Sequence, residues 1–291
     1  MIESEASIYP STIPPLLVIT DLDGTLLDHF SYSFKSALPA LATLRKLEIP
    51  LIPNTSKTIT ETLELRKQLG CDDPFVVENG SAIVLPHSQF PELETTEING
   101  YAGHVLTLGI KHQRILDLLE DLRGRFKFTG FSDMGTSQIR ELTGLSTQEA
   151  LQAKERYYSE PLQWQDSEKA RSAFAAALHE RGLRSLQGGR FLHVLGNVDK
   201  GMATRHLQRI YQQKYRFNIP TVVLGDSKND IAMLEAGDNP IIIRSPTHDI
   251  PKLKSGHKPI VSEQPGPTGW NRCILKLLEQ LQLNQGANFH G

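Results

Sequence analysis

The stretch LLVITDLDGT (residues 16–25) decides the fold class of this chain. Its first half is apolar and β-branched, which is typical of a strand buried on both faces. Asp21 and Asp23 follow directly, and Gly24 permits a sharp turn after them. Ligands bind at the carboxyl ends of the strands in open parallel sheets. Two carboxylates at such an end therefore indicate an active site, although an Asx-rich turn is the simpler alternative.

Strand and helix patterns alternate on both sides of this stretch. Thr58 and Glu61 predict a capping box at the start of one helix, and Gly70 predicts its end. We expect strands at 16–20, 49–55, 74–80, 221–226, 240–245 and 259–261, and helices at 37–47, 58–70, 201–213, 229–237 and 269–283. This order predicts an α/β fold with a Rossmann-like core, a parallel sheet with right-handed crossovers.

The middle of the chain has a different texture. Short strand-like and helical patterns follow one another there. They include a helix expected at 146–156 with Ser146 as its N-cap, and 183–196 predicts a hairpin that turns at Gly188-Gly189. This pattern predicts an α+β unit with an antiparallel sheet, inserted between the two halves of the parallel core. We expect a leader at 1–14, a catalytic core at 15–85 and 197–291, and an inserted α+β cap at 86–196.

Composition narrows the classes of function. The 291 residues carry a net charge of −2 with scattered basic side chains, so nothing draws the chain to nucleic acid or an anionic membrane. No window holds the ~20 apolar residues that span a bilayer, and the acidic N-terminus is unlike a signal peptide. Cys71 and Cys273 are expected to be free thiols. We expect a soluble cytoplasmic protein, and the sequence does not predict its oligomeric state.

A second acidic motif, Gly225-Asp226-Ser227-Lys228-Asn229-Asp230, lies between an apolar strand and a helix. Hard oxygen ligands suit Mg²⁺, and Asp226 is the better candidate for a direct ligand. Asp230 would hold Asp226 or a bound water in place, and Asn229 would donate a hydrogen bond toward a phosphate. The alternative is that both aspartates only cap the helix. Two acidic strand ends in one sheet favour the metal site.

These two motifs resemble the first and fourth motifs of the haloacid-dehalogenase-like phosphatase superfamily. Thr55, at the end of the second strand, matches the phosphate-binding hydroxyl residue of that family. Lys200, in Asp199-Lys200-Gly201 at a helix start, matches its phosphate-neutralising lysine. The resemblance implies that Asp21 is the nucleophile and Asp23 the general acid and base. It also implies a magnesium site made by Asp21, Asp23, Asp226 and Asp230.

The insertion narrows the resemblance. A cap of roughly 110 residues between the third strand and Lys200, together with Glu78-Asn79-Gly80, resembles the sugar-phosphatase branch with a large α+β cap. The usual Thr-Gly-Arg of that branch is replaced here by Thr55-Ser56-Lys57-Thr58, which resembles the mannosyl-3-phosphoglycerate phosphatases. Further stretches that share this resemblance are 156–161, 189–193, 225–227 and 266–271.

Such a substrate, a small phosphorylated sugar-glycerate, carries a phosphate, a carboxylate and a sugar. Lys57, Arg156 and Arg190 are candidates for the carboxylate. Glu160 and His193 are candidates for the sugar hydroxyls, although His193 could equally be a packed histidine in an apolar strand. The resemblance adds Ser56, Asn79 and Asn229 to the substrate-binding residues. For each of the charged residues a plain surface position is the alternative.

The resemblance implies a magnesium-dependent phosphatase that hydrolyses mannosyl-3-phosphoglycerate through an aspartyl-phosphate. Closure of the cap would exclude water from the reaction. Rivals are a phosphatase for glucosyl-3-phosphoglycerate, sucrose phosphate or a hexose phosphate, and a phosphomutase. A non-catalytic sugar-phosphate sensor is a further alternative, but it would be expected to lack Asp23 or Asp226.

Overall fold

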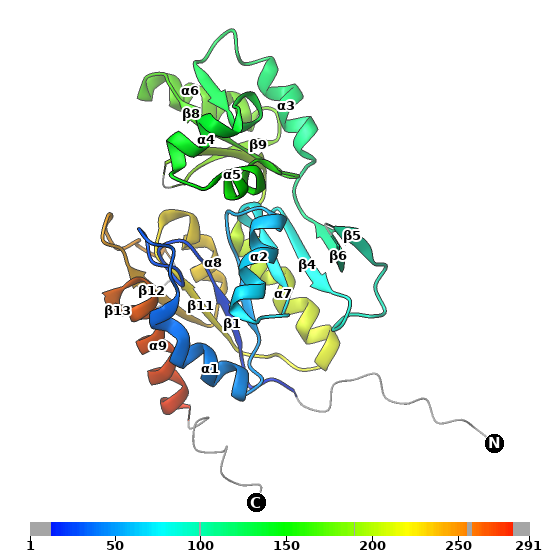
Figure 1. Ribbon diagram of the computed structural model, residues 1–291, viewed down its shortest axis with the longest axis vertical. Helices are drawn as coiled ribbons and strands as arrows, with labels where there is room; N and C mark the ends of the chain where they lie inside the picture. Colours follow the sequence, from blue (N-terminus) through cyan, green and yellow to red (C-terminus); the bar gives the residue numbers. More distant parts are fainter. Residues whose placement is uncertain (1–12, 99, 189, 255–257, 282–291) are drawn as a thin grey trace, which may run out of the picture.

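The computed structural model describes residues 13–98, 100–188, 190–254 and 258–281 (Figure 1). Most of the predicted leader and the last residues of the helix expected at 269–283 lie outside the described residues, as does Gly189 of the predicted turn. Within that part of the chain no helix combines the length and the apolar character needed to cross a membrane. Cys71 and Cys273 are both free, as expected.

A five-stranded parallel sheet forms the core, and β1 (Leu17–Thr20) lies inside it between two neighbours. The full order is β13 (Ile260–Pro265), β12 (Asn239–Arg244), β11 (Thr221–Gly225), β1 and β2 (Leu51–Pro53). Every residue of β1 is buried, as its apolar run predicted. Val18 faces one apolar cluster and Ile19 the other, so both faces of the sheet are covered.

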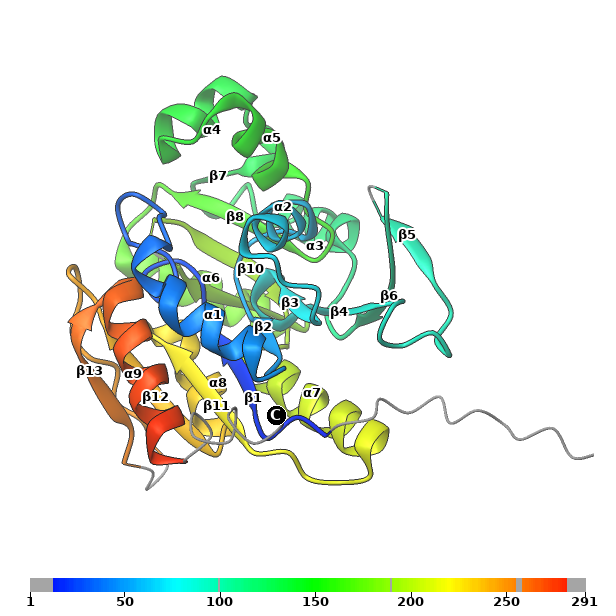
Figure 2. The ribbon, with the colours of Figure 1, turned by 60° about the horizontal axis from the view of Figure 1, so that its bottom comes forward.

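Helices cover these two faces. One cluster contains α1 (Leu38–Lys46) and α9 (Gly266–Gln280), and the other contains α7 (Lys200–Tyr215) and α8 (Ile231–Ala236). Figure 2 shows α1 and α9 on the near side of the sheet. Burying a large apolar side chain contributes ~1.5–3 kcal/mol, so these two layers hold the strand ends in place. The predicted α/β core is confirmed.

The helix α2 (Ile59–Leu69) begins and ends as predicted. The Thr58 hydroxyl accepts from Glu61 N, the Glu61 carboxylate accepts from Thr58 N, and Gly70 closes the helix with φ of 59°. Such a capping box satisfies two backbone donors that the first turn leaves unpaired. The capping box fixes the start of α2 and therefore also the end of the loop between β2 and α2, which contains Thr55 and Lys57.

The third predicted strand differs from expectation. Only β3 (Phe75–Val77) of the stretch 74–80 is extended, and an isolated bridge between Asn54 and Val76 is its sole ladder contact with β2 in the described residues. A short helical turn, η2 (Glu78–Gly80), reverses the chain, so β3 pairs antiparallel with β4 (Ala82–Pro86). The sheet continues through β6 (Tyr101–Thr107) to β5 (Thr96–Ile98) and so crosses the expected boundary between residues 85 and 86.

A second antiparallel sheet lies above the core in Figure 1. Its order is β7 (Phe128–Gly130), β8 (Ser159–Trp164), β10 (Leu192–Gly196) and β9 (Leu183–Gln187). The helices α3 (His112–Glu120) and α6 (Glu168–His179) pack on one face of this sheet. The predicted hairpin is confirmed, because Leu192 pairs with Gln187 and Gly196 with Leu183.

Two further helices complete this unit. The sequence predicted α5 (Thr147–Lys154), and its N-cap Ser146 forms the expected cap. It did not predict α4 (Thr136–Thr143), a short helix whose packing is confined to a small cluster with α5. The hydroxyl of Thr58 donates to the carbonyl of Gln152 at 2.9 Å, so α5 touches the start of α2 in the core.

Candidate active site

Three carboxylates meet at one edge of the parallel sheet. Asp21 follows β1, Asp226 follows β11, and Asp230 ends the short turn η4 (Lys228–Asp230). Because β1 and β11 are adjacent parallel strands, their carboxyl ends lie side by side. One oxygen of each carboxylate lies within 4.8 Å of the other two, and all three residues are buried. The two acidic motifs therefore form one site, as the sequence predicted.

Lys200, the first residue of α7, lies among these carboxylates. Its Nζ donates to Asp21 Oδ1 at 2.5 Å and to Asp230 Oδ1 at 2.7 Å, and its side chain is fully buried. Burial disfavours the charge of Lys200, but Asp21 and Asp230 outweigh it and raise the pKa of this ammonium above its ordinary value. Lys200 is therefore a fixed positive charge in the site.

The carboxylates outnumber this single cation. Burial, and then the charge of Asp230, raise the pKa of Asp21 well above its usual range and that of Asp226 to about 8. When all three carboxylates are ionised, they exceed the one ammonium by two negative charges among buried residues. Oxygen donors with this surplus fit a hard divalent cation such as Mg²⁺. The residues present thus suit the metal that the family resemblance implied.

Asp226 and Asp230 differ in how many of their oxygens the chain already uses. Asp230 Oδ1 accepts from Lys200, and Oδ2 accepts from the backbone N–H groups of Asp226 at 3.1 Å and Ser227 at 3.0 Å. Among the residues that the structure describes, Asp226 accepts only from a threonine hydroxyl and a histidine. This favours Asp226 as a direct metal ligand and Asp230 as the residue that holds the loop.

That histidine was not among the residues predicted from the sequence. His248 lies in the chain between β12 and β13, and its Nε2 lies 3.2 Å from Asp226 Oδ2. The threonine is Thr25 of the first motif, whose hydroxyl lies 3.3 Å from Asp226 Oδ1. No motif or spacing marks His248, because the loop brings it to the site only in the folded chain.

Gly24 is required at its position for two reasons. Its φ is +85°, a conformation that side-chain-bearing residues rarely adopt. A Cβ at this position would also lie 2.6 Å from Asp226 Oδ2. The turn after β1 therefore brings the backbone against the metal-binding candidate, and only glycine leaves room for both.

Asp23 lies beside the cluster in a more open place. Its side chain is 37% exposed, against 7% for Asp21, and its Oδ2 lies 3.0 Å from Lys57 Nζ. Asp23 Oδ1 is buried and meets no donor in the described part of the chain. Burial opposes the charge of Lys57, but Asp23 and Glu61 raise the pKa of its ammonium. Asp23 and Lys57 thus form an ion pair at the rim of the site.

Thr55 and Asn79 lie close to each other behind this pair. Thr55, which follows Asn54, is buried. Its hydroxyl accepts a hydrogen bond from Lys57 N at 3.2 Å. Asn79 N donates to Thr55 O at 2.9 Å, and Asn79 Oδ1 accepts from Asn229 Nδ2 at 3.3 Å. The structure therefore brings Thr55 and the acidic motif of Asn229 together through the turn after β3.

His193 lies on the face of the cap sheet opposite its helices. Leu192 and Val194 face α3 and α6, so the side chain between them points the other way. His193 is nearly fully buried, and its Nδ1 finds no hydrogen-bond partner within the described residues. Burial, then the charges of Arg156 and Lys200, lower the pKa of this imidazole to about 3. His193 is therefore neutral.

Two further candidates for substrate binding, Arg156 and Glu160, already form hydrogen bonds with other residues of the protein. Arg156 donates to the Ser56 carbonyl at 3.3 Å and to Ser159 Oγ at 2.8 Å. Its partner Ser56 is half-buried in the loop after Thr55. The carboxylate of Glu160 lies on the helix side of the cap sheet, 2.7 Å from His112 Nε2.

Glu160 and Arg190 do not join the group around Asp21. Glu160 Oε1 also accepts from Ser132 N at 2.8 Å, so its oxygens are used inside the cap. Arg190 is exposed, and its guanidinium donates to the carbonyls of Leu142 and Thr143 at 2.9 Å. It thereby caps the end of α4, where a positive charge is favourable.

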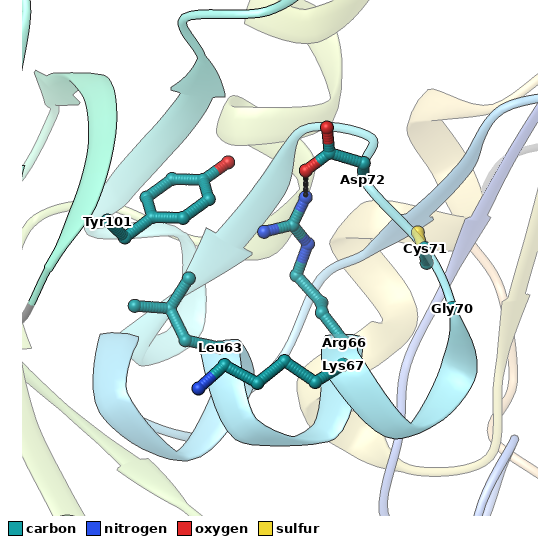
Figure 3. A pocket seen from close by; sticks show the side chains of 7 residues that line it. All are labelled: Leu63, Arg66, Lys67, Gly70, Cys71, Asp72 and Tyr101. Atoms are coloured by element: carbon teal, nitrogen blue, oxygen red, sulfur yellow. Dashed lines mark hydrogen bonds and ion pairs between the residues drawn. The ribbon is translucent and has the colours of Figure 1, made fainter.

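A separate pocket lies away from this site, beside α2. It has a volume of about 300 Å³, and Arg66 and Tyr101 contribute its largest polar side chains (Figure 3). Arg66 stacks on the rings of Phe75 and Tyr101 and donates to the Asp73 carbonyl at 2.6 Å. None of the residues around Asp21 lines it.

The chain is similar to known proteins over most of its length. A family model described as haloacid dehalogenase-like hydrolase matches residues 18–253. A protein of Methanococcoides burtonii named glucosyl-3-phosphoglycerate/mannosyl-3-phosphoglycerate phosphatase is 40% identical over 265 residues, 90% of this chain and 97% of that protein. A protein of the same name from Persephonella marina is 38% identical, covering 92% of this chain and 98% of its own.

Solved structures share the fold at low sequence identity. A Thermoplasma acidophilum protein superposes with a TM-score of 0.63 at 16% identity, covering 92% of this chain and 98% of its own. The sucrose-phosphatase of Synechocystis sp. PCC6803, solved with sucrose and phosphate, gives 0.58 at 18% identity, with 92% and 98% coverage. These likenesses support the fold alone.

Proposed function

Because the chain belongs to the haloacid dehalogenase-like hydrolase family, we propose that it is a phosphatase for glycosyl-3-phosphoglycerates, with mannosyl-3-phosphoglycerate as substrate and the glucosyl compound as the nearest alternative. The observation that carries the proposal is the meeting of Asp21, Asp226 and Asp230 around the buried ammonium of Lys200. The names of the relatives support the substrate class.

A divalent metal, Mg²⁺ in this proposal, would be held by the carboxylates of Asp21 and Asp226 and by the backbone carbonyl of Asp23. Asp230 would hold the loop of Asp226 in place through the N–H groups of Asp226 and Ser227. The metal would supply positive charge that offsets the repulsion between a carboxylate and a phosphate ester.

In the first step an oxygen of Asp21 attacks phosphorus in line with the ester oxygen. The new Asp21 O–P bond forms as the P–O bond to the glycerate breaks, and Asp23 gives its proton to the leaving glycerate oxygen. Lys200, Thr55 and the backbone N–H groups of the loop after Asp21 stabilise the charge on the remaining phosphoryl oxygens.

In the second step water hydrolyses the aspartyl-phosphate. Asp23, now ionised, takes a proton from the water, whose oxygen bonds to phosphorus as the Asp21 O–P bond breaks. This step restores the Asp21 carboxylate and releases inorganic phosphate. The ion pair with Lys57 keeps the Asp23 carboxylate at the rim, where water can reach it.

Substrate choice is assigned to the cap and to the loop after β2. We take the cap to be the β7-β8-β10-β9 sheet with its helices, inserted between the β3-β4-β6-β5 sheet and Lys200. The unpaired Nδ1 of His193, on the side of this sheet away from its helices, would bind a sugar hydroxyl. Lys57 would bind the glycerate carboxylate, and Asn229 would bind the phosphate.

A panel of phosphate-release assays with Mg²⁺ tests this function. Mannosyl-3-phosphoglycerate and glucosyl-3-phosphoglycerate should release phosphate with kcat/KM at least about 10²-fold above that of sucrose phosphate or a hexose phosphate, because only they offer a carboxylate to Lys57. A preference for the simple sugar phosphates would overturn the substrate. Conversion without phosphate release would indicate a phosphomutase, and binding without conversion a sensor.

A further inference from the structure

The turn between β3 and β4 has an unusual backbone. Glu78, Asn79 and Gly80 all have positive φ, of 49°, 58° and 93°. Two consecutive side-chain-bearing residues in this region are strained, and such strain persists only where the surroundings hold it. The turn is also completely buried, so the contacts that hold it are all within the protein.

On the side that faces the core, the turn contacts three parts of the proposed phosphate site. Asn79 N donates to Thr55 O at 2.9 Å, and Asn79 Oδ1 accepts from Asn229 at 3.3 Å. Gly80 packs against the backbone of Asp199 and Lys200 so closely that a Cβ would collide with the Asp199 carbonyl. The turn therefore lies against Thr55, Lys200 and Asn229 at once.

On the opposite side, the same turn forms hydrogen bonds with the segment that leads into the cap sheet. The Glu78 carboxylate accepts from Tyr157 N at 2.9 Å, Tyr158 N at 3.1 Å and Ser159 Oγ at 2.6 Å. The guanidinium of Arg156 lies 3.8 Å from it and also donates to Ser56 O. A fully buried carboxylate needs such donors, because a charge without them would be costly to bury.

The segment that Glu78 holds leads directly into the cap sheet. Ser159 is the first residue of β8 and pairs with Leu195 of β10, two residues from His193. A movement of Tyr157–Ser159 would therefore move the strand pair that carries His193. Glu160, a buried carboxylate within the cap, forms its hydrogen bonds in the described ranges of the chain with His112 and Ser132 of the cap.

We propose that Glu78 is a positioning residue that couples the cap to the phosphate site, so that the two are ordered together when a substrate binds. The idea rests on the proposed phosphatase function. A substrate whose sugar and glycerate reach the cap should depend on Glu78. A small ester that fills only the phosphate site should not.

Glu78→Gln tests the coupling, because the amide keeps the size of the side chain but turns one acceptor into a donor that faces Tyr157 N, Tyr158 N or Arg156. We expect kcat/KM for mannosyl-3-phosphoglycerate to fall about 10²-fold, as for a misplaced binding group. Hydrolysis of p-nitrophenyl phosphate should change by less than about threefold. Ser159→Ala, which removes one donor, should shift the ratio of the two activities in the same direction by a smaller factor.

Glu160→Gln is the matched control, since it alters a buried carboxylate of the cap that does not touch the core. It should lower Tm without changing the ratio of the two activities by more than about threefold. Equal losses on both substrates in Glu78→Gln and Ser159→Ala, or the same ratio in Glu160→Gln, would show that Glu78 only stabilises the fold.

A second readout does not depend on the sugar substrate. In the wild type, Mg²⁺ with inorganic phosphate should slow amide hydrogen exchange in residues 157–164, and in Glu78→Gln or Ser159→Ala this slowing should be reduced. Unchanged slowing in both variants would overturn the coupling. Failure of the wild type to release phosphate from any glycosyl-3-phosphoglycerate would instead overturn the proposed function, with the exchange result still deciding the role of Glu78.

Discussion

At the scale of single residues, the site is a buried cluster of three carboxylates and one ammonium group. Lys200 contacts Asp21 and Asp230, and Asp226 lies beside them without an ion pair to the lysine. The cluster is therefore incomplete without a further cation. This imbalance makes the roles of Lys200 and of the metal separable by experiment.

Lys200→Met should destabilise the metal-free protein, because the methionine fills the same space without the charge. Removing one partner of a buried ion pair costs ~3–5 kcal/mol. The loss of unfolding free energy, measured by urea denaturation, should be larger at pH 8 than at pH 5, because the raised pKa values of Asp21 and Asp226 leave less carboxylate charge at the lower pH. An equal loss at both pH values would contradict the charge balance.

The stability of the metal-free protein should fall as pH rises. The folded-state pKa values of Asp21 and Asp226 are raised, that of Asp226 from 3.8 to about 8, so the folded protein binds more protons than the unfolded chain in this window. In EDTA we expect Tm to drop by ~4 °C or more between pH 6.5 and pH 8, above the range in which His193, with its lowered pKa, acts in the opposite direction. Mg²⁺ should remove most of this drop, and a Tm that rises with pH in EDTA would contradict it.

At the scale of elements, the strand ends and their turns determine the site. The buried run 16–20 and the run 221–226 predicted two strands of one parallel sheet, which the structure confirms, and it shows them to be neighbours. The antiparallel pairing of β3 with β4 was missed because the left-handed conformations of Glu78 and Asn79 leave no mark in the sequence pattern. The short helix α4 was missed because few of its side chains are buried, so its apolar pattern is weak.

Gly24→Ala tests the turn after β1. The alanine would have to adopt a φ near +85° with its Cβ against Asp226 Oδ2. We expect kcat to fall about 10²-fold, because the carboxylate must move, and stability to fall by ~1–3 kcal/mol. Gly144→Ala, at a similar φ but with open space around it, is the control: it should cost stability and leave kcat nearly unchanged. Equal kcat in both variants would contradict the close approach to Asp226.

At the scale of the whole molecule, the sequence located the site but not every group around it. Asp21, Thr55, Lys200 and Asp226 come together because they end strands or begin a helix at one edge of a sheet, which a sequence pattern can show. In the cap, the strand register determines which side chains face the helices. One residue of offset points Glu160 toward α3, while His193 points away from the helices. A single sequence does not give that register.

Lys57 and Arg190, two of the three candidates for the substrate carboxylate, lie in different surroundings and can be separated by experiment. Lys57→Met should raise KM for mannosyl-3-phosphoglycerate about tenfold or more and also lower kcat, because it loses both a cation and the partner of Asp23. Arg190→Met should lower stability by less than ~1 kcal/mol and leave KM nearly unchanged, since its donors are used at the end of α4. A larger KM effect at Arg190 would reverse the assignment.

The most direct test of the central proposal is to find the phosphoryl group on the protein. Rapid quenching in acid during turnover, followed by peptide mass spectrometry, should find one added phosphoryl group on the peptide that contains Asp21. Asp21→Asn should show no such adduct and no phosphate release, while keeping its fold by circular dichroism. An adduct on another residue, or near-normal turnover by Asp21→Asn, would contradict the assignment of Asp21 as the nucleophile.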